Sequence, residues 1–186
     1  MIKKGILTLV LTIITTLTFA QSQHITSAAI IFKQYNSEKD KSVKAVKIKE
    51  AKEFIDKAYN NESTSNTPKM WMYRAQIYKM IALNHDSLDS DAIFKATESH
   101  LKCMQPHPKK KNKIMIYKKW PKEDVLAGLV QCGYKLFNKA IEEYTAGNYK
   151  SSLKHYTAIF DIMPFDEEDQ LKRGNITKET IAILPR

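Results

Sequence analysis

Cysteine and histidine, residue types often used as metal ligands and nucleophiles, are few in this 186-residue sequence. It has two cysteines, Cys103 and Cys132, and five histidines, at positions 24, 85, 100, 107 and 155. No histidine lies in an H-E-x-x-H pattern, and no cysteine–histidine group has the spacing of a zinc site. His100 and Cys103 share a helical face at i, i+3, but such a pair without a third ligand is ordinary packing. The sequence therefore predicts no metal centre.

Patterns for nucleophilic, phosphate-binding and acid–base chemistry are also missing from the sequence. There is no G-x-S-x-G motif, and the glycines are too sparse for a loop that cradles phosphate. Asp86, Asp89 and Asp91 lack the glycine and the distal glutamate of a calcium loop, so helix capping explains them better. Glu142 and Glu143 are adjacent and point in different directions from a helix. We expect a protein that is not an enzyme and takes no cofactor.

The amino terminus has the features of a secretory signal peptide. Lys3 and Lys4 precede an apolar run over residues 6–19, and the small residues Thr18 and Ala20 come just before Gln21. The alternative is an uncleaved membrane anchor, but the run is shorter than the ~20 residues that span hydrocarbon. We predict that residues 1–20 are removed and that the mature protein is periplasmic or secreted. An oxidising compartment permits a disulfide between the two cysteines, and two buried thiols are the alternative.

The composition fits a soluble globular protein with a basic surface. Hydrophobic residues make up 43% and charged residues 27%, and 30 Lys and Arg against 20 Asp and Glu give a net charge of +10. In an exported protein this charge favours anionic lipids, cell-wall polymers or acidic proteins as partners, and not nucleic acid. The alternative is a lysine-rich solvated surface with no binding role.

Residues 109–119 concentrate the positive charge in one loop. Six lysines surround the apolar run 114–117, at positions 109, 110, 111, 113, 118 and 119. An irregular insertion of this length is either functional or merely mobile. Together with Tyr117 and Trp120, these lysines make a candidate surface for docking on an anionic envelope. The alternative is a solvated excursion whose apolar residues tuck onto the helices.

Elsewhere, apolar residues recur with the period of α-helices, so we predict an all-α protein. The expected helices cover residues 25–35, 42–60, 67–83, 90–104, 121–146 and 149–163. Ser42 is the expected N-cap of the second helix, and Asp89 or Ser90 that of the fourth. Gly147 supplies the turn after the fifth helix, and Leu153 belongs to the apolar stripe of the sixth. Residues 166–172 are expected to form a short helix, and 175–181 the start of another.

The end of the helical region resembles the second half of a tetratricopeptide repeat. The motif is carried by Gly147, Tyr149, Ser152, Tyr156, Ile159 and Pro164. Trp71, Ala75 and Tyr78 are similar to the opening of such a repeat, with Arg74 in place of the usual leucine. Ala51, Ile55 and Ala58 match the spacing of a closing helix. The resemblance implies a right-handed stack of about three helical hairpins over residues 21–165, with residues 166–186 as a tail or the start of a further helix.

In this family, the first helix of each hairpin lines a concave surface that holds a peptide or a partner helix. Carried over position by position, the resemblance places binding residues on two helices, namely Lys69, Met72, Tyr73, Gln76, Lys79, Tyr134, Asn138, Ile141 and Thr145. Lys69 and Lys79 favour an acidic ligand. We therefore expect an exported interaction module without catalytic activity. The alternative function is adhesion to anionic lipid or cell-wall polymer through residues 109–119.

Overall fold

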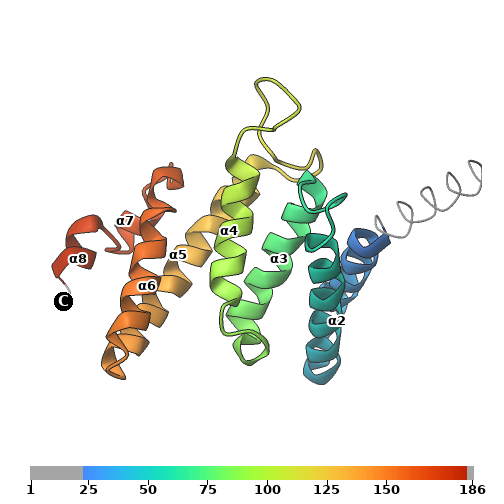
Figure 1. The fold of residues 1–186 in the computed structure, drawn as a ribbon. Coiled ribbons are helices and arrows are strands. Elements are labelled where there is room, and N and C mark those ends of the chain that lie inside the picture. Colours follow the sequence, from blue (N-terminus) through green and yellow to red (C-terminus); the bar gives the residue numbers. More distant parts are fainter. Residues whose placement is uncertain (1–22, 184–186) are drawn as a thin grey trace, which may run out of the picture. The chain divides into compact units, whose positions relative to one another are not determined.

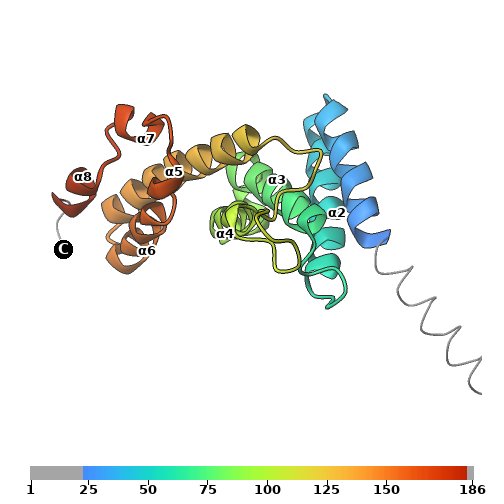
Figure 2. The ribbon, with the colours of Figure 1, turned by 90° about the horizontal axis from the view of Figure 1, so that it is seen from above.

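The computed structural model describes residues 23–183, which form helices joined by loops (Figures 1 and 2). No β-strand forms within that range, where Pro106 and Ile114 make an isolated β-bridge. The predicted all-α class is therefore confirmed. The chain divides into two compact units, Met1–Tyr73 and Arg74–Arg186, with the boundary inside helix α3 (Pro68–Asn84). The predicted signal peptide lies outside the described residues.

In the first unit, a helix over residues 23–37 and helix α2 (Lys41–Tyr59) form an antiparallel hairpin (Figure 1). His24 contacts Phe54 with ring centroids 6.0 Å apart, and Lys44 Nζ lies 4.7 Å from the centroid of the Tyr35 ring. Because residue numbers rise on one helix as they fall on the other, the two helices run in opposite directions. The hairpin buries one stripe of α2, formed by Ile48, Ala51, Ile55 and Ala58.

Helix α2 begins one residue before the expected N-cap, so the assignment of Ser42 was wrong. Asp40 is the N-cap, and its carboxylate accepts hydrogen bonds from the backbone N–H groups of Ser42 at 2.7 Å and Val43 at 3.1 Å. A carboxylate also suits the positive end of the helix dipole, which explains why the aspartate takes this place.

The loop between α2 and α3 is anchored by a buried threonine. The Thr64 hydroxyl donates to the Ala58 carbonyl at 2.5 Å, which satisfies one of the free carbonyls at the end of α2. At the start of α3, Trp71 packs edge-on against Tyr59 with ring centroids 5.6 Å apart. The polar loop over residues 60–67 is thereby held between the end of α2 and the start of α3.

In the second unit, α3 is joined to α4 (Ala92–Met104) through a short 3-10 helix, η1 (Asp86–Leu88). Arg74 is only 4% exposed and spans the pair. Its Nη1 donates to the Lys95 carbonyl at 3.1 Å, to Ser99 Oγ at 2.6 Å and to Glu98 Oε2 at 2.9 Å. The arginine that departs from the repeat motif therefore ties α3 to α4 through polar contacts.

Helix α4 starts slightly later than the sequence indicated, and neither Asp89 nor Ser90 is its N-cap. Asp91 occupies that position without a side-chain capping bond. Asp89 instead accepts a hydrogen bond from the Asp91 N–H at 3.1 Å and from Lys95 Nζ at 2.6 Å. The aspartate therefore stabilises the turn before the helix and the first turn within it.

Helices α5 (Lys122–Thr145) and α6 (Tyr149–Phe160) form a second antiparallel hairpin, close to the predicted ranges. Gly147 turns the chain at a φ of 79°, where glycine avoids the strain that a side chain would bring. Ser152 Oγ donates to the Ala140 carbonyl at 2.8 Å, and Phe137 packs edge-on against Tyr156. The small serine therefore lets the two helix axes approach. Helix α6 ends at Phe160, before a 3-10 turn, η2 (Met163–Phe165).

The chain after η2 forms two short helices, α7 (Gln170–Arg173) and α8 (Lys178–Ile183). Leu171 is buried against α5 at Gly133, where an added Cβ would lie 2.8 Å from the leucine Cδ2. The Tyr134 hydroxyl donates to the Gln170 carbonyl at 2.6 Å. Residues 170–173 are therefore packed onto α5.

Candidate functional site

The predicted binding residues of the first unit lie at the start of α3 and are not all accessible. Lys69 and Tyr73 are half-buried, and Met72 is buried with 5% of its surface exposed. Met70, Trp71 and Met72 are all in the core, since α3 is apolar nearly all round. The prediction that Met72 presents its side chain to a ligand is therefore wrong.

Two more predicted residues, Gln76 and Lys79, lie on the part of α3 that belongs to the second unit, and both are half-buried. Burial lowers the pKa of the Lys79 ammonium, while Cys132 and Asp124 act in the opposite direction. Lysine tolerates partial burial because its aliphatic stem packs while the head reaches water. Lys79 is thus a less available cation than the sequence suggested.

On α5, the predicted residues differ in what they contact. Asn138, Ile141 and Thr145 are exposed, and the Thr145 hydroxyl donates to the Ile141 carbonyl at 2.9 Å. Tyr134 is engaged with the chain after η2, because its hydroxyl is bonded to Gln170 and its ring lies against Gly174. Tyr134 therefore holds α7 on α5, whereas Asn138, Ile141 and Thr145 remain open to a partner.

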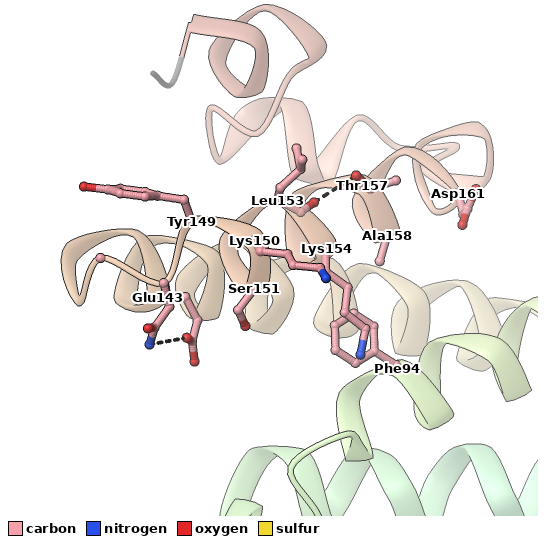
Figure 3. Close-up of a pocket in the computed structure, with 12 residues that line it drawn as sticks. Phe94, Glu143, Tyr149, Lys150, Ser151, Leu153, Lys154, Thr157, Ala158 and Asp161 are labelled. Carbon is pink, nitrogen blue, oxygen red and sulfur yellow. Dashed lines mark hydrogen bonds between the residues drawn. The ribbon is translucent and has the colours of Figure 1, made fainter. Parts of the chain in front are cut away.

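An open groove of about 1160 Å³ runs along α6 in the second unit (Figure 3). It extends from the turn at Gly147 to Asp161, with Phe94 of α4 at its side. Tyr149 is 62% exposed and Leu153 is 66% exposed, although Leu153 was expected in the buried stripe. That expectation was wrong because α6 buries the neighbouring face, formed by Ser152, His155, Tyr156 and Ile159. These two large apolar side chains, exposed one helical turn apart, make the groove a candidate contact surface.

The side of the groove next to α4 is held by ring and charge contacts. Lys154 Nζ lies 4.1 Å from the centroid of the Phe94 ring and 2.9 Å from Asp91 Oδ1. The Phe94 ring also packs against His155, with centroids 4.7 Å apart. Figure 3 shows Lys154 directed toward Phe94 and Leu153 directed away from it. The groove therefore has a fixed wall at α4 and an open apolar side at Leu153.

The most reactive side chains of the described residues, a histidine and two cysteines, are buried between helices of the second unit. His100 Nδ1 donates to the Ala96 carbonyl at 2.8 Å, while Nε2 has no hydrogen-bond partner among the described residues. Burial, followed by the charge of Lys79, lowers the pKa of His100 to about 4. Cys103 and Cys132 are free thiols, and burial raises the pKa of each to about 12. Within residues 23–183, no three His, Cys, Asp or Glu side chains are placed to hold a metal ion.

The lysine-rich loop folds as a hairpin between α4 and α5. The His107 N–H donates to the Lys113 carbonyl at 2.7 Å, and the Met115 N–H to the Gln105 carbonyl at 2.9 Å. Met115 is buried, and Trp120 packs against His100 with ring centroids 5.6 Å apart. The predicted role of Trp120 in docking is therefore wrong, because its ring anchors the loop to the protein.

Comparison with known proteins gives no functional information about this chain. No family model, curated protein or solved structure matches this chain. Among the helices of residues 23–183, none has the length and apolar character needed to cross a bilayer. The structure thus offers two candidate surfaces in the second unit, namely the groove along α6 and the lysine hairpin over residues 105–115.

Proposed function

We propose that this chain is an exported, non-catalytic interaction module whose helical hairpins stack in the right-handed manner of tetratricopeptide repeats. The α5–α6 hairpin supports this proposal, because its residues perform the packing tasks that the repeat motif requires. Gly147 makes the turn, Ser152 allows close approach, and Tyr156 fills the space between the helices. A hairpin buries only one side by itself, and a neighbouring hairpin completes its core.

The observation that carries the proposed function is the groove along α6, with its exposed Tyr149 and Leu153. A peptide or partner helix with apolar side chains at i, i+4 spacing would cover both residues. Lys150 is exposed beside them, so acidic residues flanking the apolar anchors would strengthen binding. The partner is therefore an amphipathic segment with acidic flanks.

The exposed residues of α5 form a second candidate face, separate from the groove, because none of them lines it. Asn138 can donate and accept hydrogen bonds with a bound backbone, and Ile141 offers an apolar contact. Asn138, Ile141 and Thr145 are the residues of the predicted binding face that remain exposed in the structure and, within the described range, form no hydrogen bond with the chain after η2. The proposal therefore rests on the groove first and on this α5 face second.

Selection from a displayed library of amphipathic helical peptides, followed by fluorescence anisotropy, tests the proposal. The informative variants are Leu153→Asp in the groove and Ile141→Asp on α5. Val46→Asp is the matched control, because Val46 is 63% exposed on α2 and lies in the first unit. We expect Leu153→Asp to weaken the selected peptides at least tenfold, and Val46→Asp to leave them unchanged. The proposal fails if no peptide is enriched, or if all three variants bind as the parent does.

A further inference from the structure

The lysine hairpin presents a concentrated positive charge that the proposed groove function does not use. No aspartate or glutamate occurs between Glu98 and Glu123, so residues 99–122 are free of acidic side chains. Six lysines of this stretch are exposed, at positions 109, 110, 111, 113, 118 and 119. In the described range, none of the six forms an ion pair, whereas Lys95, Lys122 and Lys154 each contact a carboxylate. The charge is therefore available to an external anion.

The hairpin holds its lysines in a fixed place relative to α4 and α5. Its two arms are joined by the backbone bonds at His107 and Met115, and Asn112 adopts a φ of 58° at the tip. In Figure 1 the loop projects beyond the carboxyl end of α4. Buried Met115 and Trp120 fix its base. Four of the lysines, Lys109 to Lys111 and Lys113, are thereby gathered at a projecting tip.

We propose that this tip binds the anionic surface of a phospholipid bilayer by electrostatic attraction, without inserting into it. A projecting tip touches a flat surface with several charges at once. Each lysine near an anionic membrane adds attraction independently of sequence. The tip over residues 107–113 has no apolar side chain other than its proline ring, so nothing there enters the hydrocarbon. Binding at the tip is expected to be fast, reversible and strongly dependent on salt.

The residue types favour a diffuse anionic surface over a single carboxylate or phosphate group. The cations are all lysines, and residues 105–121 contain no arginine. Lysine acts as a compact hydrated point charge, whereas arginine provides the planar fork that recognises one anion in two-point contact. Nucleic acid is a less suitable partner, because the rings that would stack on bases are withdrawn. Trp120 is buried and Tyr117 is half-buried.

Vesicle co-sedimentation of the full chain tests the proposal. The vesicles are phosphatidylcholine alone, or phosphatidylcholine with 30% phosphatidylglycerol, at 50 mM and 500 mM NaCl. The test variant carries Lys109→Gln, Lys110→Gln, Lys111→Gln and Lys113→Gln. The control variant carries Lys33→Gln, Lys39→Gln, Lys41→Gln and Lys49→Gln, which removes the same charge from exposed positions of the first unit. The apolar run 6–19 is present in every sample, so the neutral vesicles report its contribution.

We expect the parent chain to bind anionic vesicles at 50 mM NaCl more tightly than neutral ones, and to lose this difference at 500 mM. The test variant should weaken binding to anionic vesicles by about 10³-fold, and the control variant by less than tenfold. Equal losses in the two variants would overturn the proposal, because net charge alone would then explain binding. Tighter binding to a 20-base-pair DNA duplex than to the anionic vesicles would also overturn it. A groove variant such as Leu153→Asp should leave vesicle binding unchanged, which separates this site from the proposed function.

Discussion

The burial of His100 leads to a quantitative expectation for stability in acid. The folded-state pKa is about 4, whereas an unfolded histidine titrates near 6.5. The unfolded chain therefore binds this proton first, and folding stability is lost as the pH falls below 6.5 toward 4. The difference of about 2.5 units corresponds to about 3–4 kcal/mol, at about 1.4 kcal/mol per unit, and most of it is lost by pH 4. The structural cause is the buried Nε2, which has no acceptor among the described residues when it is protonated.

The assay compares the parent with His100→Gln, whose amide can still donate to the Ala96 carbonyl. Both chains carry Trp71→Phe, so that fluorescence reports Trp120, which lies beside His100 in the second unit. Urea titrations at pH 7 and pH 4 give the free energy of unfolding for each chain. We expect the stability difference between parent and variant to shift by about 3 kcal/mol in favour of the variant on acidification.

A buried residue that does not titrate provides the control for this experiment. Ser99→Ala removes the hydrogen bond from Arg74, at 2.6 Å, and should cost the same free energy at both pH values. Protonation of carboxylates also lowers the stability of the protein in acid. Both variants keep the same carboxylates, so this contribution cancels when the two are compared. If the difference between the parent and His100→Gln is the same at pH 7 and pH 4, the argument from burial is wrong.

Four further expectations follow from other parts of the chain. Gly128→Ala should destabilise the second unit by about 1–3 kcal/mol in urea titrations, because its Cβ would lie 2.2 Å from His100 Nε2; an unchanged midpoint would contradict this. Arg74→Met should cost about 2 kcal/mol, since it removes the charged donor of the Ser99 hydroxyl and of the Glu98 carboxylate, while the Lys95 carbonyl still accepts from Ser99; a neutral result would show that the arginine bonds contribute nothing. Cys103 and Cys132 should resist iodoacetamide at pH 8 until urea unfolds the chain, and rapid labelling or a disulfide in mass spectra would refute their burial as thiols. Expression in a Gram-negative host should yield a periplasmic chain that begins at Gln21, and an intact amino terminus in the membrane fraction would contradict cleavage after Ala20.

The helical fold could be predicted from the sequence because the spacing of apolar residues is a local property. The stripe through Ile48, Ala51 and Ile55 predicted a helix that buries those residues, and α2 does so. The turn at Gly147 was equally clear, since a left-handed conformation favours glycine. The N-cap of α2 was harder to predict, because Asp40 and Ser42 are both residue types that favour this position and they lie two residues apart. The loop after residue 37 decides between them, because the Glu38 carboxylate accepts hydrogen bonds from the N–H groups of Lys39 and Asp40 just before the helix.

The candidate site could be predicted only in part, because exposure depends on which helices lie next to one another. Met72 and Leu153 are both apolar residues on helices, and the sequence analysis expected Met72 to be exposed and Leu153 to be buried. Met72 is covered on a helix that packs on most of its faces, whereas Leu153 lies just outside the stripe that α6 buries. The lysine loop was located from its charge, but its hairpin pairing depends on backbone bonds between residues far apart in the loop. The spacing of apolar residues therefore predicts where helices form, but not which of their residues stay exposed once the helices pack.

The burial pattern separates the reactive side chains from the surfaces proposed to bind partners. His100, Cys103 and Cys132 are held in the interior, where burial keeps the imidazole uncharged and the thiols protonated. Two surfaces of the second unit stand apart from this interior, namely the exposed apolar side chains along α6 and the lysines without an ion pair at the hairpin tip. The first kind binds through removal of apolar area from water and is little affected by salt, whereas the second binds through charge and weakens as salt rises. On the two proposals above, the protein would hold an amphipathic partner while it is bound to an anionic surface, and a rise in ionic strength would dissociate it from the surface before the partner.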